Sequence, residues 1–270
     1  MQLQDAGYRT VRFETDGPVA YVTMNRPEKR NALSVEHMQE LTDCFRRIGE
    51  RQDLSVAILR GAGPAFCAGH DLAELVGRGI AFYRHVFRVC IRMMDTLQQI
   101  PQPVIAQVHG MATAAGCQLV ATCDLAVAST EARFATPGVR IGLFCSTPMV
   151  AVSRNLPRKK VLEMLLTGEP LSAEEALRYG LVNRVVPPDR LEEETRQLAL
   201  RIASASAPVV GLGKQAFYRQ LEMPQDQAYA YAQEVMSLNA LHPDATEGIC
   251  AFLDKRTPRW RGWEGPQVAE

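Results

Sequence analysis

Two stretches of small residues have the pattern of a site that binds an oxygen atom through backbone N–H groups. They are residues 68–71 (Ala-Gly-His-Asp) and residues 110–116 (Gly-Met-Ala-Thr-Ala-Ala-Gly), and each follows an apolar run typical of a buried strand. In the second stretch a strand, a small-residue turn and a helix follow one another, which leaves unpaired N–H groups and the positive end of the helix dipole at the turn. Such donors stabilise negative charge that develops on a ligand oxygen, and one donor is typically worth ~10²–10³ in rate.

Loops that follow the carboxyl ends of strands are where ligands bind in α/β proteins. One explanation of the small residues is therefore that N–H groups of residues 68–71 and 110–116 converge on one carbonyl oxygen, where they would stabilise an enolate or a tetrahedral oxyanion. Tight packing of a strand against a helix is a second explanation for the same small residues. The residue pattern favours neither explanation.

Metal and disulfide chemistry are not indicated by the sequence. The cysteines are dispersed without a C-x-x-C pair, and the histidines have no metal-ligand spacing such as H-E-x-x-H. Dispersed cysteines fit buried free thiols in a reducing compartment better than a disulfide framework. We expect no metal site.

The first half of the chain must position the two loops through alternating strands and helices. A hairpin is predicted over residues 8–24 with its turn at Asp16-Gly17, and Ser34 is the expected N-cap of the next helix. A long helix should end near Pro101. Apolar runs predict further strands at residues 56–59, 104–108 and 125–128. This alternation predicts an α/β chain with parallel crossovers.

After about residue 147 the pattern becomes mainly helical. Ser172 and Glu175 form a capping box at one helix start, and Asp189 with Glu192 gives the same pattern for a second helix. The last part of the chain is predicted to contain only helices, with breaks expected near residues 211–213, Pro224 and Pro243.

The point after which only helices are predicted divides the chain into an α/β core, residues 1–205, and a helical region, residues 206–270. A helical region that cannot cover its own apolar face would fold over the core or pack against a second subunit. A simple helical extension of one domain fits the pattern about as well.

The bulk composition is that of an ordinary globular protein. Of the 270 residues, 47% are hydrophobic and 22% charged. Thirty basic residues balance thirty acidic ones, so the net charge suggests neither nucleic acid nor an acidic membrane surface as a partner. No secretory signal is visible, and no apolar run approaches the ~18 residues of a membrane span. We therefore expect a cytosolic protein.

Taken as a whole, the chain resembles the crotonase, or enoyl-CoA hydratase/isomerase, superfamily over nearly its entire length. The form of residues 112–118 is similar to one subgroup that has vertebrate and bacterial members. The short motifs that carry the resemblance, specific in combination, lie at residues 25–27 (NRP), 31–33 (NAL), 66–72 (FCAGHDL), 103–110 (PVIAQVHG), 115–124 (AGCQLVATCD), 134–137 (FATP), 166–168 (LTG), 173–176 (AEEA), 180–182 (GLV) and 252–256 (FLDKR).

The resemblance implies a crotonase-like spiral of ββα/βαβ turns followed by a C-terminal helical trimerisation region. It also implies a homotrimer or a dimer of trimers. The ligand implied is an acyl-CoA thioester, with coenzyme A as part of the substrate and no other cofactor. The thioester carbonyl would lie between the backbone N–H groups of His70 and Ala115, which match the positions of the family's oxyanion hole.

Further residues match the family's coenzyme A site. Phe252 and Lys255 match positions that can reach the coenzyme A of a neighbouring subunit, although a solvated helix end explains Lys255 equally well. Asp71 and Asp124 are expected to cap or pin their loops rather than to react. The residues expected to line the coenzyme A groove are Asn31, Ala32, Ala68, Asp71 and Leu72.

Two departures from the family pattern put its usual chemistry in doubt. Family hydratases hold a water between two glutamates, and here Gln118 stands at the first position and Gly138 at the second. Gln118 can hydrogen-bond a water but cannot take its proton, and Gly138 has no side chain. The resemblance therefore implies a nominal enoyl-CoA hydratase of fatty-acid metabolism whose hydration is weak or absent.

Other functions remain open at this point. One is a non-catalytic acyl-CoA binding protein. Another is decarboxylation of a malonyl-type thioester, which needs an enolate stabiliser more than a strong base and which a related decarboxylase with the same Ala-Gly-His-Asp sequence suggests for His70. The tyrosine expected in that decarboxylase aligns near Cys145, which weakens this match. A Cys145–His70 nucleophilic pair is conceivable, but a buried, unactivated thiol is the preferred interpretation of Cys145.

Overall fold

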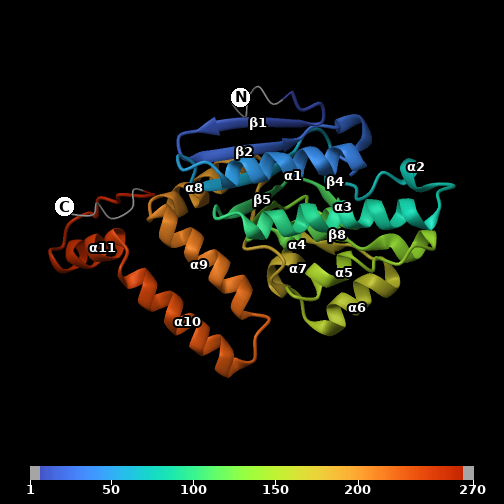
Figure 1. Ribbon diagram of the computed structural model, residues 1–270. Coiled ribbons are helices and arrows are strands. Elements are labelled where there is room, and N and C mark those ends of the chain that lie inside the picture. The colour runs from blue at the N-terminus through green and yellow to red at the C-terminus, as the bar shows by residue number, and fades with distance from the viewer. Residues whose placement is uncertain (1–6, 264–270) are drawn as a thin grey trace.

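A computed structural model describes residues 7–263 and has the predicted mixed α/β architecture (Figure 1). Its larger sheet has six strands in the order β1-β2-β3-β5-β7-β10. The first two strands form the predicted antiparallel hairpin, and the other pairs are parallel. The strands of this sheet are β1 (Val11–Asp16), β2 (Val19–Met24), β3 (Val56–Gly61), β5 (Val104–Val108), β7 (Leu125–Ser129) and β10 (Arg184–Val186).

A second, four-stranded sheet has the order β4-β6-β8-β9. Each of β3, β5 and β7 is followed in the chain by a short strand of this second sheet, so the chain spirals between the two sheets. This is the ββα/βαβ spiral that the resemblance implies. The strands of the second sheet are β4 (Ala65–Cys67), β6 (Met111–Thr113), β8 (Arg133–Ala135) and β9 (Leu171–Ser172).

Helices cover both faces of the six-stranded sheet. The helices are α1 (Val35–Gly49), α2 (Leu72–Leu75), α3 (Ile80–Gln99), α4 (Ala115–Thr122), α5 (Pro148–Val152), α6 (Arg158–Thr167), α7 (Ala173–Tyr179), α8 (Leu191–Ala203), α9 (Ala207–Gln220), α10 (Gln225–Ala240) and α11 (Pro243–Leu253). Three 3₁₀ turns complete the described chain: η2 (Pro27–Lys29), η3 (Pro137–Ile141) and η4 (Pro188–Arg190).

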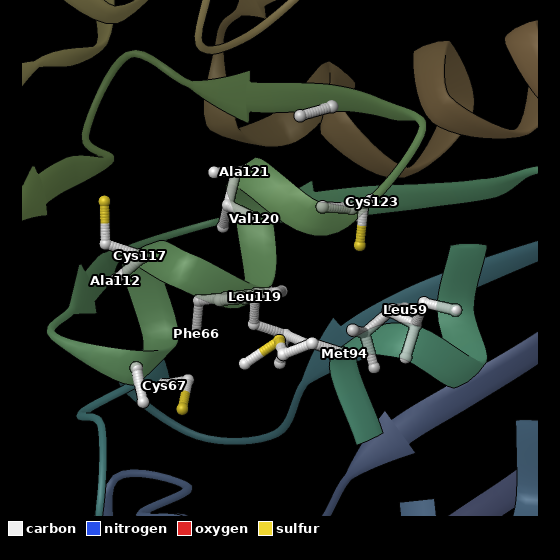
Figure 2. Close-up of a cluster of buried hydrophobic side chains, with 14 of the residues drawn as sticks. Leu59, Phe66, Cys67, Met94, Ala112, Cys117, Leu119, Val120, Ala121 and Cys123 are labelled. Carbon is white, nitrogen blue, oxygen red and sulfur yellow. The ribbon is translucent and has the colours of Figure 1, made fainter. Parts of the chain in front are cut away.

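The main core lies between the sheets and helices α1, α3 and α4. Helix α1 follows its predicted cap, since the Ser34 side chain accepts a hydrogen bond from the His37 N–H, and its apolar stripe is buried. Every residue of α4 is buried, including the polar Gln118 and Thr122. Figure 2 shows part of this cluster, with side chains from β4, α3 and α4 gathered together. A smaller core forms on the opposite face of the six-stranded sheet, under α8.

Two local predictions for the C-terminal part are wrong. The Asp189 side chain does not cap α8, because Pro188 begins a 3₁₀ turn and the helix starts only after Arg190, without a side-chain cap. The expected break at residues 211–213 is absent, because α9 runs through it. A Cβ at Gly211 would lie 2.8 Å from the Pro101 Cβ, so this glycine serves close packing of α9 on the core.

The last two helices extend from the body of the molecule (Figure 1). Helix α10 has no buried residue, and large apolar side chains of α10 and α11 are exposed, for example Met236 at 77% and Phe252 at 83%. The division at residue 205 and the trimer stay predictions. Within residues 7–263, the helices are too short or too polar to cross a membrane.

Candidate functional site

The two small-residue loops lie against each other in the fold. Residues 68–70 follow β4 and residues 114–115 follow β6, and these strands are parallel neighbours. Gly69 has a φ of +86°, and a Cβ there would lie 2.9 Å from the Ala114 Cβ and 3.3 Å from the Ala115 nitrogen. The close approach of the loops therefore requires a glycine at position 69.

The backbone N–H groups of His70 and Ala115 form no hydrogen bond within residues 7–263. Leu33 and His70 form a parallel bridge in which the Leu33 N–H donates to the Gly69 oxygen (2.7 Å) and the Asp71 N–H donates to the Leu33 oxygen (3.0 Å). The N–H of His70 itself then points away from Leu33. Ala115 begins α4, so its N–H has no acceptor in the helix. Neither N–H has an acceptor within residues 7–263.

The start of α4 is held in an unusual backbone conformation. Ala114 has a φ of +50° although it is not a glycine, and its N–H donates to the Ala135 oxygen (2.8 Å). Such a conformation costs on the order of 1–3 kcal/mol and is typical of functional sites. Tight packing is also present, because a Cβ at Gly116 would lie 2.2 Å from the Cys67 oxygen. Both explanations of the small residues therefore apply, at different positions.

A cavity of about 400 Å³ opens beside the two loops. His70 and Ala115 line it together with Ala68, and residues 137–148 close its other side. This volume is in the range of small-molecule sites. Most of the surface is apolar and comes from Leu72, Phe87, Ile141, Leu143, Phe144 and Pro148.

The cavity contains no free positive charge among its described lining residues. Arg140 is the one arginine or lysine there, and its guanidinium donates to the Thr167 oxygen (3.0 Å) and pairs with Glu169. Burial lowers the pKa of His70 to about 4, with the Leu33 carbonyl acting in the opposite direction. At neutral pH the His70 ring is therefore uncharged.

The His70 ring packs edge-on against Phe87, with the ring centroids 5.5 Å apart. Neither ring nitrogen has a hydrogen-bond partner in the described part of the chain. Burial also raises the pKa of the Cys145 thiol. A neutral thiol beside a neutral imidazole is not an activated nucleophile, which agrees with the structural interpretation of Cys145.

Gly138 lines the cavity, whereas Gln118 is not among its lining residues. Gln118 is one helical turn beyond Ala115, is only 5% exposed, and its Oε1 has no partner among residues 7–263. Gly138 belongs to η3, and a Cβ there would lie 1.9 Å from the Leu143 oxygen. A backbone carbonyl thus occupies the space that any side chain at position 138 would need.

The residues expected around coenzyme A have different positions. Ala68 and Leu72 line the cavity, whereas Ala32 is 9% exposed and Asn31 is fully buried. The Asn31 amide accepts from the Arg26 N–H (2.9 Å) and donates to three carbonyl oxygens, so its side chain holds the loops together. Phe252 and Lys255 are exposed and do not line the cavity of their own chain.

Asp71 and Asp124 both hold loops in place, as expected. Asp71 caps α2 through the Ala73 N–H (3.3 Å) and forms an ion pair with Arg26 (2.9 Å). Asp124 accepts from the Val104 N–H (2.6 Å). The remaining partners of Asp124 come from α9 and were not predictable from the sequence: the Lys214 ammonium at 2.8 Å and the Tyr218 hydroxyl at 2.8 Å.

Sequence reasoning also missed Leu143 and Phe87 as parts of the site. The role of Leu143 depends on its backbone oxygen, for which no side-chain pattern exists. Phe87 belongs to the apolar stripe of α3. It differs from the core residues of that stripe only in lying at the edge, so the sequence pattern did not single it out.

Comparison with known proteins identifies the family. The family model described as enoyl-CoA hydratase/isomerase matches residues 14–263. The chain belongs to this family. Enoyl-CoA hydratase domain-containing protein 3, mitochondrial, of Rattus norvegicus is 49% identical and covers 92% of this chain and 82% of its own. (E)-benzylidenesuccinyl-CoA hydratase of Thauera aromatica is 35% identical and covers 93% of this chain and 99% of its own.

Solved structures agree with this membership of the enoyl-CoA hydratase/isomerase, or crotonase, family. Human enoyl coenzyme A hydratase domain-containing protein 3 superimposes with a TM-score of 0.91 at 47% identity, over 93% of this chain and 100% of its own. An enoyl-CoA hydratase of Mycobacterium smegmatis also has a TM-score of 0.91, at 46% identity, over 93% of this chain and 98% of its own. The predicted superfamily, subgroup and fold are confirmed.

The predicted cytosolic location is wrong in the light of these relatives. Vertebrate relatives at 48–49% identity are named as mitochondrial proteins. The prediction rested on the missing secretory signal. A secretory signal says nothing about import into mitochondria, because mitochondrial transit peptides have a different, Arg-rich amphipathic pattern.

Proposed function

We propose that this member of the enoyl-CoA hydratase/isomerase family binds an acyl-CoA thioester with its carbonyl oxygen between the backbone N–H groups of His70 and Ala115. The observation that carries the proposal is the contact of the two loops, which brings two N–H donors without acceptors in residues 7–263 to one cavity. Hydrogen bonds from fixed backbone donors in a water-poor site polarise the carbonyl and stabilise an enolate. The acyl chain occupies the apolar part of the cavity.

The acyl group is neutral in this proposal. A malonyl-type substrate carries a carboxylate, and burying it needs a cationic partner. The Arg140 guanidinium is engaged by Glu169 and Thr167, and the His70 ring is uncharged at neutral pH. The decarboxylase alternative therefore loses its main support, although the His70 and Ala115 donors would suit its enolate.

Hydration by this site is weak or absent in the proposal. Gln118 offers an oxygen that can orient a water but cannot remove its proton. Position 138 has no side chain, and the Leu143 oxygen fills the space where one would begin. General acid and base groups each contribute ~10²–10⁴ to such reactions, so their absence leaves a site that polarises its ligand without moving protons efficiently.

Binding without catalysis is the second candidate. The observation that favours it is the occupied space at Gly138, since a carboxylate cannot be added there without moving residue 143. In both candidates coenzyme A is part of the ligand and Ala68 and Leu72 contact it. We also propose a homotrimer or dimer of trimers, in which Phe252 and Lys255 approach the ligand of a neighbouring subunit.

Calorimetry and hydration assays on the same preparation test the proposed function. Octanoyl-CoA should bind at least ten-fold more tightly than free CoA, because burial of apolar surface adds about 0.8 kcal/mol per CH₂ group. Hydration of crotonyl-CoA and octenoyl-CoA should stay at least ~10²-fold below typical enzyme rates. Equal affinities for free CoA and octanoyl-CoA would overturn the binding proposal, whereas fast hydration would overturn only the roles assigned to Gln118 and Gly138.

A further inference from the structure

Helix α3 and the turn before it contain a run of basic residues without any acid. Residues 76–94 include four arginines, Arg78, Arg84, Arg88 and Arg92, and no aspartate or glutamate. The balance of thirty basic and thirty acidic residues over the whole chain hides this local excess. A local excess of this kind attracts anions even when the net charge is zero.

Three of these arginines form a row on the solvent side of α3. Arg84, Arg88 and Arg92 are spaced four residues apart, which places them on one face at steps of about 6 Å along the axis. All three are exposed. The opposite face of α3 is buried through Val86, Cys90, Met93, Met94 and Leu97.

No carboxylate of the described chain neutralises this row. None of the ion pairs within residues 7–263 includes Arg84, Arg88 or Arg92. Like charges four residues apart destabilise a helix. An external anionic surface would remove this repulsion.

Apolar side chains project beside the basic row. Val76 is 78% exposed and Ile80 is 64% exposed, and both lie in or next to the turn that joins α2 to α3. Figure 1 shows α2 and this turn at the edge of the molecule, beyond the first turn of α3. Basic side chains next to exposed aliphatic ones are the combination that binds a bilayer surface, because the former contact phosphates and the latter enter the headgroup region. A soluble polyanion would contact the arginines but would not bury the exposed aliphatic side chains.

We infer that this surface, formed by Val76, Arg78, Ile80, Arg84, Arg88 and Arg92 and called here the α3 basic face, docks the protein on an anionic phospholipid bilayer. Docking needs no segment that crosses the membrane. The same two helices line the cavity through Leu72 and Phe87, so a docked molecule would hold the cavity next to a reservoir of acyl chains. The role of the cavity beside the bilayer rests on the proposed function, whereas the docking itself does not.

Flotation of the full-length protein with vesicles tests the inference. One set of vesicles contains phosphatidylcholine and phosphatidylglycerol, and the other contains phosphatidylcholine alone. Wild type should bind the anionic vesicles at least ten-fold more tightly, and high salt should release it. Each arginine near such a surface contributes about five-fold, so the R84Q/R88Q/R92Q variant should bind on the order of 100-fold more weakly.

A matched triple variant separates the α3 basic face from net charge. R12Q/R158Q/R201Q removes three exposed arginines that form no ion pair within the described chain, and it should retain wild-type binding within a few fold. Val76→Ser with Ile80→Ser, which removes the apolar side chains without adding charge, should weaken vesicle binding about ten-fold. Circular dichroism confirms folding of every variant.

Three results would overturn the inference. The first is equal binding of wild type to both kinds of vesicle. The second is an equal loss of vesicle binding in the two triple arginine variants, which would show that binding depends on net charge and not on the α3 basic face. The third is unchanged vesicle binding by the Val76→Ser, Ile80→Ser variant together with equally tight binding to soluble heparin, which would indicate a surface for soluble polyanions.

Discussion

At the scale of residues, the proposed function depends on backbone hydrogen-bond donors rather than on side chains that carry protons. The proposed donors are the backbone N–H groups of His70 and Ala115. Their positions require only that neighbouring residues such as Gly69 are small. The side chains that could carry protons are unsuited to do so at neutral pH, because the pKa of His70 is lowered by burial and that of Cys145 is raised by burial. Gln118 and Gly138 supply no acid or base.

Sequence alone indicated the donors and the replaced carboxylates, but not why position 138 is a glycine. A Cβ at position 138 would lie 1.9 Å from the Leu143 oxygen, and this is the reason for the glycine. A backbone atom has no signature in the sequence, so substitution of Gln118 and Gly138 by glutamate looks from sequence like a simple repair. The structure adds that the segment around Leu143 must move before a side chain fits at position 138.

The buried His70 predicts a loss of stability in acid. Its ordinary pKa is 6.5, whereas burial lowers the pKa in the folded state to about 4. Between these values the unfolded chain binds a proton that the folded chain does not, so the free energy of unfolding falls as the pH drops through this window. The full shift corresponds to on the order of 3 kcal/mol.

Urea unfolding between pH 7 and pH 4 measures this loss. His70→Gln should flatten the pH dependence, and His85→Gln, at an exposed position of α3, should leave it unchanged. His37, whose pKa burial lowers to about 3, retains its own contribution in both variants. An unchanged slope in His70→Gln would mean that the His70 ring is solvated in the folded state.

At the scale of elements, α4 is the part on which the site depends. Its start is fixed on three sides, by the Ala114 N–H bond to Ala135, by contact of Gly116 with Cys67, and by contact of Ala114 with Gly69. Strand β5 and helix α4 were predictable because each has a strong local pattern, whereas β6 lies within the stretch that was predicted as a small-residue turn. The continuous α9 was not, because the reason for Gly211 is a distant contact with Pro101.

Gly116→Ala should therefore destabilise the protein, because its Cβ would lie 2.2 Å from the Cys67 oxygen. Overpacking of this kind costs ~1–3 kcal/mol, and displacement of α4 should also weaken acyl-CoA binding. Gly213→Ala is a matched control, since a Cβ there meets no atom within 4 Å and α9 is helical at this position. The control should gain about 0.4–1 kcal/mol.

Chemical denaturation and calorimetry on both alanine variants give the comparison. Gly116→Ala with wild-type stability and affinity would show that α4 can shift away from β4 without consequence. Loss of binding by Gly213→Ala would show instead that α9 is coupled to the cavity.

At the scale of the whole molecule, the site joins residues 68–72, 113–115 and 137–148, which are separated in the chain and meet through the spiral. The six-stranded sheet was largely predictable from apolar runs. The second sheet was not, because β4, β6 and β8 have only three residues each, too few for a periodic pattern. The buried Lys214, which ties α9 to Asp124, also has no local signal; burial lowers its pKa, and Asp124 opposes this effect.

The central claim is that donors from two distant loops polarise one thioester carbonyl. Infrared difference spectroscopy of bound octanoyl-CoA, labelled with ¹³C at the carbonyl, observes this polarisation without any turnover. Ala115→Pro is the variant that removes one donor, because proline lacks the N–H; circular dichroism must establish its folding, since the preceding Ala114 has a φ of +50°. Calorimetry on the same samples establishes that the ligand is bound.

The account predicts that the carbonyl band of the bound thioester lies at a lower wavenumber than in water, and that the difference shrinks in a folded Ala115→Pro variant. A band at the same wavenumber as in water, measured on saturated wild-type protein, would contradict it.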